Sequence, residues 1–264
     1  MSENVLSSVP CEIISIKEEN AHEYTFRIDT DITASHGQFL QINVPKFGEA
    51  PISVSGMGYG YLDFTIRAVG KVTEELFRLH AGDTIYLRGP YGVGWPFDKF
   101  QGKNLVIIAG GTGVAPIKTM VDAICKDKSY VASLNLLFGY RDENCILFRD
   151  DLAKWKTEFN TTYTLDNGIV DGFEQGMVTK HLDKVFKPEF GDKYEVIVVG
   201  PPAMMHFTCL DLVKMGIPEQ KIWTSFERKM SCAVGKCGHC RINEVYVCSE
   251  GPVFNYTVAK DLLD

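Results

Sequence analysis

The sequence predicts a multi-domain β and α/β protein: an antiparallel barrel, a parallel-sheet domain and a small C-terminal module. Three observations predict this fold class. Apolar and polar residues alternate over about the first 100 residues, continuous apolar runs alternate with helical periodicity after them, and four cysteines crowd the end of the chain. We therefore expect three domains, at residues 1–98, 99–223 and 224–264.

Short alternating runs make up the predicted barrel. Every second residue is apolar in runs at 24–28, 40–44, 62–68 and 85–87. This period is typical of strands with one buried face. Glycine-containing turn sequences separate the runs, at residue 48, at 56–60 and at 81–83. A short helix is expected near 73–79, and the whole pattern favours a small antiparallel barrel.

The second domain begins where the apolar runs become continuous. Strands are expected at 105–109, 134–140 and 194–200, and helices at 117–125 and 205–212. Strands buried on both faces and connected by helices form a parallel sheet of the nucleotide-binding type.

Glycine-rich turns follow two of these strands. The first turn contains Gly110, Gly111, Thr112, Gly113 and Pro116, and the second contains Gly200, Pro201 and Pro202. Glycines allow a pyrophosphate to approach the backbone, and a helix that starts there offers free N–H groups. Each turn alone also fits a simple tight connection, but both lie at the carboxyl edge of one sheet, where ligands of open sheets bind.

The cysteines of the C-terminal module have a spacing typical of metal centres. They are Cys232, Cys237, Cys240 and Cys248. The first three have the spacing of a plant-type 2Fe-2S site, and Gly235 and Gly238 would let the loop turn its N–H groups toward the sulfurs. Structural zinc and disulfides are the alternatives. The short gap before the fourth cysteine predicts a tight hairpin through 242–247.

Composition excludes several classes of protein. The chain has 264 residues, 45% of them hydrophobic, and a net charge of −7, which disfavours a nucleic-acid surface. No run reaches the length of a membrane span, and the N-terminal stretch lacks the regions of a secretory signal. We expect a cytoplasmic protein in which Cys11, Cys125, Cys145 and Cys209 pack in the core.

Several motifs together carry a family resemblance. Residues 51–53, 66–73, 89–92, 110–116 and 199–205 occur in the order seen in the ferredoxin-NADP reductase superfamily. The chain resembles the branch with a C-terminal 2Fe-2S cluster, which includes the electron-transfer subunit of dihydroorotate dehydrogenase. Segments 48–55, 225–241 and 244–256 are most similar to the family of anaerobic sulfite reductase B subunits.

This resemblance implies FAD in the barrel, a nicotinamide nucleotide in the second domain and a 2Fe-2S cluster held by the four cysteines. The implied FAD contacts are Pro51, Ile52, Ser53, Val54, Ile66, Arg67, Ala68, Gly70, Lys71, Val72 and Thr73. The implied nucleotide contacts are Gly110, Gly111, Thr112, Gly113, Pro116, Gly139, Arg141, Asp166, Gly200, Pro201, Pro202 and Met204. Residues 51–54 would border the flavin, and the Thr73 hydroxyl would bind its pyrophosphate. Ala50 departs from the superfamily, which has an arginine there.

The preference between NADH and NADPH depends on charge near the adenosine ribose. Asp166 and Asn167 follow a strand end at Tyr163, with no basic residue beside them. An acidic residue suits a free 2′-hydroxyl, so NADH is favoured. Arg141 follows another strand end and opposes this choice, unless it is a solvated loop residue.

The implied activity is electron transfer from NADH through FAD and the cluster to partner subunits. By resemblance these are the iron-sulfur and sirohaem subunits of a sulfite reductase. The alternatives are an electron-transfer subunit of dihydroorotate dehydrogenase or of a hydrogenase, and a non-catalytic scaffold stapled by zinc. No catalytic residue is required, because the cofactors carry the chemistry.

The charged residues near the cysteines each have two possible roles. Glu227 could face the flavin or nicotinamide, or take part in a surface ion pair. Basic residues crowd the cluster loop of this acidic chain: Arg228, Lys229, Lys236, His239 and Arg241. They would attract an acidic partner, or they form a solvated loop.

Overall fold

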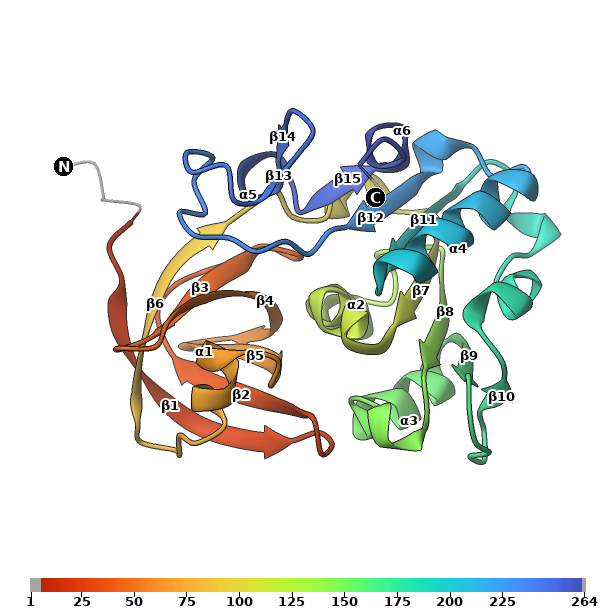
Figure 1. Cartoon of the computed structure of the whole chain (residues 1–264). Helices are drawn as coiled ribbons and strands as arrows, with labels where there is room; N and C mark the ends of the chain where they lie inside the picture. Colours follow the sequence, from red (N-terminus) through yellow and green to blue (C-terminus); the bar gives the residue numbers. More distant parts are fainter. Residues whose placement is uncertain (1–5, 263–264) are drawn as a thin grey trace. The chain divides into compact units, whose positions relative to one another are not determined.

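The computed structural model describes residues 6–262 and contains two compact units (Figure 1). Unit 1 comprises the chain up to Trp95 together with 115–119 and 227–252, and unit 2 comprises 96–114, 120–226 and the chain from Val253 onward. Residues 1–5, part of the stretch compared with a secretory signal, and 263–264, the end of the third expected domain, lie outside the described residues.

Unit 1 is built on a closed antiparallel barrel with the strand order β1-β2-β5-β4-β3-β6. Its strands are β1 (Val9–Glu18), β2 (Glu23–Asp29), β3 (Phe39–Val44), β4 (Gly48–Gly58), β5 (Tyr61–Arg67) and β6 (Thr84–Tyr91), and helix α1 is Lys71–Leu76. The alternating runs lie in β2, β3, β5 and β6, which confirms the expected barrel. The alternation did not reveal β1, and the turn expected at residue 48 is the first position of β4.

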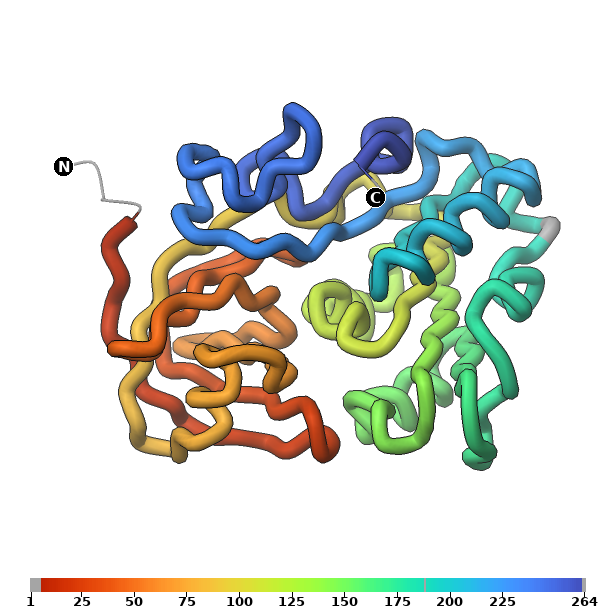
Figure 2. Tube along the Cα trace, in the orientation of Figure 1, coloured from red at the N-terminus to blue at the C-terminus, as the bar shows by residue number. Residues whose placement is uncertain are grey.

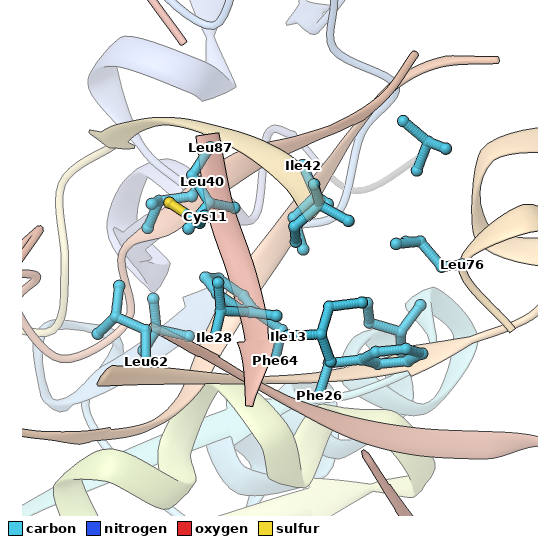
Figure 3. Packing of buried hydrophobic residues seen from close by; sticks show 14 residues of the cluster. Cys11, Ile13, Phe26, Ile28, Leu40, Ile42, Leu62, Phe64, Leu76 and Leu87 are labelled. Carbon is cyan, nitrogen blue, oxygen red and sulfur yellow. The ribbon is translucent and has the colours of Figure 1, made fainter. Parts of the chain in front are cut away.

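The barrel is filled by the inward-facing residues of these strands (Figure 3). Phe26, Leu40 and Phe64 are fully buried, and Leu76 of α1 is buried in the same cluster. Burying such a side chain contributes about 1.5–3 kcal/mol. The alternate residues face away from the core, so the outer surface of the barrel is available for other segments of unit 1.

Unit 2 contains a seven-stranded sheet with the order β10-β9-β8-β7-β11-β12-β15. Its strands are β7 (Asn104–Gly110), β8 (Ser133–Tyr140), β9 (Asn160–Leu165), β10 (Glu174–Gln175), β11 (Tyr194–Val199), β12 (Ile222–Ser225) and β15 (Val253–Asn255). All neighbours are parallel except β12 and β15. The longer helices are α2 (Ala115–Lys126), α3 (Arg149–Glu158) and α4 (Pro202–Lys214). The strand-helix pattern predicted α2 and α4, whereas α3 was not expected.

Short elements complete the chain. The cluster segment contains β13 (Arg241–Ile242), β14 (Val245–Tyr246) and α5 (Val247–Glu250), and α6 is Tyr256–Ala259. The 3-10 helices are η1 (Phe97–Phe100), η2 (Gly111–Val114), η3 (Glu143–Cys145), η4 (Val178–Lys184), η5 (Pro188–Phe190) and η6 (Glu219–Lys221). Figure 2 traces these segments by sequence colour, with the cluster segment in blue. Among residues 6–262, no helix has the length and apolar character that a membrane crossing requires.

Candidate redox site

The cysteine loop wraps backbone N–H groups around its sulfurs. The N–H groups of Val234, Lys236 and Cys237 each lie 3.4 Å from Cys232 Sγ. Gly235 N–H donates to Cys248 Sγ at 3.2 Å, and Cys248 N–H donates to Cys240 Sγ at 3.4 Å. Such donors stabilise thiolates, so the expected loop geometry is present.

Left-handed backbone conformations produce this wrapping. Gly235 and Gly238 have φ values of +69° and +80°, and Ala233 has +61°. Glycine adopts this region at no steric cost, whereas alanine rarely does so. A side chain at Gly235 would also meet Ser249 Oγ, 2.8 Å from the ideal Cβ position. The two glycines are therefore required by the shape of the loop.

The four thiols interact with one another. Cys232 forms a hydrogen bond with Cys237, Cys248 forms one with Cys240, and the charge of Cys232 also acts on Cys248. Burial acts to raise the pKa of Cys232, but the N–H donors outweigh it and lower this pKa to about 6. Burial and the neighbouring Cys240 raise the pKa of Cys248 to about 11. Cys232 is therefore readily ionised, whereas Cys248 keeps its proton until a bound cation displaces it, because a metal centre deprotonates a coordinating thiol.

This arrangement fits a 2Fe-2S cluster, in which each iron takes two thiolates from the protein. Within the described part of the chain, no three His, Cys, Asp or Glu side chains are grouped so that they could hold one metal ion. The hairpin β13–β14 brings the fourth ligand back, with Arg241 opposite Tyr246, as the short gap predicted. Cys237 is exposed, whereas Cys240 and Cys248 are buried.

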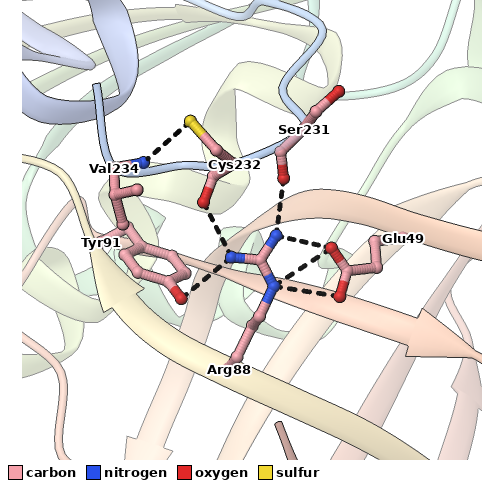
Figure 4. Close-up of polar contacts among 6 residues, drawn as sticks. All are labelled: Glu49, Arg88, Tyr91, Ser231, Cys232 and Val234. Carbon is pink, nitrogen blue, oxygen red and sulfur yellow. Dashed lines mark hydrogen bonds and ion pairs between the residues drawn. The ribbon is translucent and has the colours of Figure 1, made fainter. Parts of the chain in front are cut away.

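A buried arginine holds the start of this loop on the barrel (Figure 4). Arg88, on β6, is 5% exposed. Its Nη2 donates to Glu49 Oε2 at 2.5 Å and to the Ser231 carbonyl at 2.6 Å. Its Nη1 donates to the Cys232 carbonyl at 2.8 Å and to the Tyr91 hydroxyl at 3.0 Å. The hydrogen bond to Glu49 is the main reason that the pKa of Arg88 is raised.

The residues expected at the flavin lie on both faces of β4. Ile52 and Val54 pack on the barrel core. Pro51 and Ser53 point the other way, because successive strand residues face opposite sides. Ile66 on β5 is also a core residue, whereas Arg67 is exposed and forms an ion pair with the buried Glu23 at 2.6 Å. Ala68, directly after β5, is likewise exposed.

The turn before α1 uses the Thr73 side chain. Thr73 Oγ1 accepts hydrogen bonds from the N–H groups of Val69 and Gly70, at 3.0 and 3.1 Å, and donates to the Gly70 carbonyl at 3.0 Å. Lys71 is exposed and Val72 half-buried in the first turn of the helix. The hydroxyl therefore fixes the shape of the turn, and its contact to the FAD pyrophosphate stays a prediction.

Gln41, on β3, is fully buried although it faces away from the barrel core. Its neighbours Leu40 and Ile42 belong to the core, and its cross-strand partners are Pro51 and Arg88. Neither Oε1 nor Nε2 of Gln41 has a hydrogen-bond partner among the described residues. A buried amide needs a partner, so this position is suited to a bound polar group.

In unit 2 the two glycine-rich turns converge, as expected. Parallel pairing of β7 with β11 places Ala109 opposite Val199, so Gly110 and Gly200 leave the sheet side by side. A Cβ on Gly113 would lie 2.6 Å from the Val199 carbonyl oxygen, and one on Gly110 would lie 2.5 Å from the Met204 sulfur. These positions need glycine for the close approach of the two turns.

The other expected nucleotide residues continue along this carboxyl edge. Gly139 is opposite Gly110 in the pairing of β7 with β8. Gly111 and Thr112 lie in η2, Pro116 is in the first turn of α2, and Pro201 and Pro202 begin α4. Their contacts to a nucleotide stay predictions.

Arg141 and Asp166 follow neighbouring strands at the same edge. Asp166 N–H donates to the Tyr140 carbonyl at 3.0 Å, which holds the turn after β9 against the end of β8. Arg141 Nε forms an ion pair with Asp142 at 3.0 Å. Partial desolvation raises the pKa of Asp166. The arginine therefore has a local carboxylate partner, and Asp166 is exposed.

The charged residues near the cysteines are mostly exposed. Lys229, Lys236 and His239 are exposed, whereas Arg241 forms an ion pair with Glu244. Glu227 keeps an exposed surface, while surrounding protein desolvates its carboxyl and raises its pKa. Its proposed contact to a flavin or nicotinamide stays a prediction.

Sequence reasoning missed Glu49, Arg88 and Gln41. Arg88 directly precedes the Gly-Pro-Tyr-Gly motif, and Glu49 precedes Ala50, where the superfamily has its arginine. The position of these two opposite charges, each next to a recognised motif, was the sequence signal that could have indicated the pair. Nothing local marks Gln41, which occupies the polar position of an alternating strand.

Two known domains match this chain. An oxidoreductase NAD-binding domain matches residues 107–210, and the iron-sulfur cluster binding domain of dihydroorotate dehydrogenase B matches residues 227–258. The first match covers the two glycine-rich turns of unit 2, and the second covers the four cysteines. Both agree with the nucleotide and 2Fe-2S cofactors expected from the sequence.

Similar proteins align over nearly the whole chain. Sulfhydrogenase 2 subunit gamma of Pyrococcus furiosus is 32% identical, with 96% of each chain covered. A probable dihydroorotate dehydrogenase B (NAD(+)) electron transfer subunit of Methanocaldococcus jannaschii is 33% identical, over 93% of this chain and 89% of that protein. Both relatives are subunits of larger enzymes. Neither comparison points to sulfite reductase in particular.

The fold is also that of solved flavoproteins. A chain in the structure of NADH-dependent reduced ferredoxin-NADP oxidoreductase has a TM-score of 0.78 at 24% identity, over 97% of this chain and 90% of that one. The fold class, with its barrel, parallel sheet and cluster module, is thereby confirmed, and the cofactor set of FAD, NADH and 2Fe-2S agrees with it. This chain belongs to the family of ferredoxin-NADP reductase-like electron-transfer subunits that includes the sulfhydrogenase gamma and dihydroorotate dehydrogenase B electron transfer subunits.

Proposed function

We propose that this chain is the electron-transfer subunit of an anaerobic sulfite reductase, supplied with electrons by NADH. The observation that carries the electron-transfer role is the cysteine loop, whose sulfurs accept five backbone N–H hydrogen bonds. Such bonds stabilise the anionic sulfurs of a cluster. The resemblance of segments 48–55, 225–241 and 244–256 to sulfite reductase B subunits supports the choice of partner.

The bound groups would supply the redox chemistry: nicotinamide delivers a hydride to the flavin, and the cluster accepts electrons singly. The chain binds and orients these groups. The glycine-rich turns at Gly110 and Gly200 would carry the nucleotide phosphates. Pro51 and Ser53 would border the flavin, and the four cysteines would hold the cluster. We assign these roles to the barrel, the parallel sheet and the C-terminal module within the boundaries expected from the sequence.

NADH is the proposed electron donor. Asp166 would accept a hydrogen bond from a free 2′-hydroxyl, and the Arg141 charge is already matched by Asp142. A 2′-phosphate would instead need an unmatched cation at this edge.

A second function is favoured by the relatives. The match to a sulfhydrogenase gamma subunit and to dihydroorotate dehydrogenase electron transfer subunits supports a hydrogenase or dihydroorotate dehydrogenase as partner. The chemistry inside this chain would be the same in every case. The two functions differ in the partner subunit that exchanges electrons with this chain. With a dihydroorotate dehydrogenase that uses NAD(+), the electrons would pass from the partner through this chain to the nucleotide.

Anaerobic purification followed by spectroscopy tests the electron-transfer role. We expect visible flavin and cluster bands, iron and sulfide in equal amounts, and bleaching by NADH but not by NADPH. A colourless chain that contains zinc would contradict the role and favour the scaffold alternative. Bleaching by NADPH alone would contradict the nucleotide assignment only.

Co-purification from the native cells tests the partner. We expect the tagged chain to elute with an iron-sulfur subunit and a sirohaem subunit, and the complex to oxidise NADH when sulfite is added. Elution with a hydrogenase or with dihydroorotate dehydrogenase, and no oxidation with sulfite, would establish the second function instead.

A further inference from the structure

The contacts of Arg88 join the barrel to the first ligand of the cluster loop. Its guanidinium donates to Glu49, to the Tyr91 hydroxyl and to two consecutive carbonyls of the loop. The second carbonyl belongs to Cys232 itself. A buried guanidinium is costly unless it is paired and hydrogen-bonded, and here one carboxylate and three other oxygens satisfy it.

Fixing these carbonyls also fixes the N–H groups that follow them. In a trans peptide the N–H points opposite to the carbonyl. By holding the carbonyls of residues 231 and 232, Arg88 therefore sets the direction in which the loop continues. Ala233 then turns with a φ of +61°, and the N–H groups of Val234, Lys236 and Cys237 reach the Cys232 sulfur. Hydrogen bonds to the sulfurs are among the factors that set the potential of a cluster.

We propose that Arg88 is a positioning residue for the cluster loop, and that the Arg88–Glu49 pair sets the reduction potential of the cluster. This inference rests on the proposed function in one respect, that the loop holds a 2Fe-2S cluster. Reduction adds one negative charge to the cluster, so a nearby cation favours the reduced form and a nearby anion opposes it. In the native chain the carboxylate of Glu49 offsets the guanidinium of Arg88.

Removing either member of the pair should therefore move the potential in opposite directions. Arg88→Met leaves the Glu49 carboxylate unmatched and disfavours reduction. Glu49→Gln leaves the guanidinium unmatched and favours reduction. A unit charge about 10 Å away, at an effective dielectric of about 20, changes such an equilibrium about tenfold. For a one-electron couple, a tenfold change corresponds to about 59 mV.

The conservative variant separates charge from geometry. Arg88→Lys keeps the positive charge but cannot bind the carboxylate and both carbonyls as a planar fork does. At a given potential, we expect the ratio of reduced to oxidised cluster in this variant to stay within threefold of the wild-type ratio. Its iron should be lost to a chelator several times faster than the iron of the wild type.

The test is an anaerobic redox titration of the full chain loaded with FAD and cluster, followed by electron paramagnetic resonance. Supporting results are a lower potential for Arg88→Met and a higher one for Glu49→Gln, each by about tenfold in the equilibrium ratio. Shifts in the same direction, or none, would overturn the proposal, because a merely structural role loosens the loop in both variants.

Two controls keep the outcome decisive. Arg27 forms a similar ion pair with Asp63, at 2.7 Å, on β2 and β5 of the same barrel. Arg27→Met should leave the potential unchanged, and a shift equal to that of Arg88→Met would overturn the specific role of Arg88. If Arg88→Met does not fold, the other two variants test the proposal. A raised potential for Glu49→Gln together with an unchanged potential for Arg88→Lys supports it. An unchanged potential for Glu49→Gln overturns it.

The wild-type sample distinguishes this proposal from the proposed function. A wild-type chain without iron and sulfide would refute the cluster itself. A wild-type chain with a normal cluster, but with variants that titrate identically, would refute only the role of Arg88 and Glu49.

Discussion

Replacing the buried Gln41 by methionine should stabilise the chain when FAD is absent. The Gln41 side chain is fully buried, and neither its Oε1 nor its Nε2 has a partner among the described residues. A buried polar group without a partner costs about 1–3 kcal/mol. Methionine has a similar length and no such requirement, so we expect Gln41→Met to increase the free energy of unfolding by about 1–3 kcal/mol.

Bound FAD should reduce or reverse this gain. Pro51, which belongs to the expected flavin border, is the cross-strand partner of Gln41, so both side chains lie on the outer face of the barrel. If the flavin, or water bound with it, satisfies the amide, methionine loses that hydrogen bond. The advantage of the variant should then fall by about the net value of one hydrogen bond, roughly 0.5–1.5 kcal/mol or more.

Thermal unfolding with and without FAD measures both effects, because 1 kcal/mol shifts the midpoint by roughly 2–4 °C for domains of about 150–250 residues. Gln38 is the matched control: its Nε2 donates to the Gly92 carbonyl and its Oε1 accepts from Ser35 N–H, both at 2.9 Å. Gln38→Met should destabilise the chain in both conditions. A lower midpoint for Gln41→Met without FAD would refute the reasoning, since the amide would then already have a partner. An equal increase of the midpoint with and without FAD would show that the flavin does not provide a partner for Gln41.

Three further predictions address the cofactors and the partner. Cys232→Ala should abolish the visible cluster bands and most of the bound iron, whereas Cys11→Ala, in the barrel core, should leave both unchanged; retained bands in the first variant would exclude Cys232 as a ligand. Electron transfer from the reduced cluster to its partner should slow steeply as salt rises, and Lys236→Ala should weaken that dependence; a rate indifferent to ionic strength would remove the docking role of the basic loop. Because desolvation raises the pKa of Asp166 from its ordinary 3.8, NADH affinity should fall on acidification while the pH is still above that value, and Asp166→Asn should flatten this dependence; identical titration profiles would exclude the contact.

The fold was predictable where a strand carries a regular pattern. Leu40, Ile42 and Val44 alternate with polar residues in β3, and their burial in the barrel core follows directly. In β1 the pairing with β2 shifts between Ile13 and Ser15, which interrupts the alternation. β4 contains glycines and Pro51, residues that sequence rules assign to turns. Both strands exist because their neighbours pair with them, which is a tertiary effect.

The site was predictable where its chemistry is local in sequence. Four cysteines within one short segment, with glycines between them, were sufficient to expect the N–H-lined loop. The contacts of Arg88 were not predictable, because Arg88 is 39 positions from Glu49 and 143 from Ser231 in the sequence. Such contacts depend on the closure of the barrel and on the return of the chain to its outer face. The residue pattern within one segment therefore does not predict these contacts.

The strands that flank the cluster segment restrict how far its ends can separate. Ser225 of β12 pairs with Val253 of β15, so the residues between them form a loop closed by adjacent strands about 4.7–4.9 Å apart. Closing a loop of this kind removes many conformations from the chain before any metal binds. The four thiols are thus held at a high effective concentration relative to one another. A chain that has lost its iron should accordingly keep its cysteines close enough to accept a new cluster without refolding.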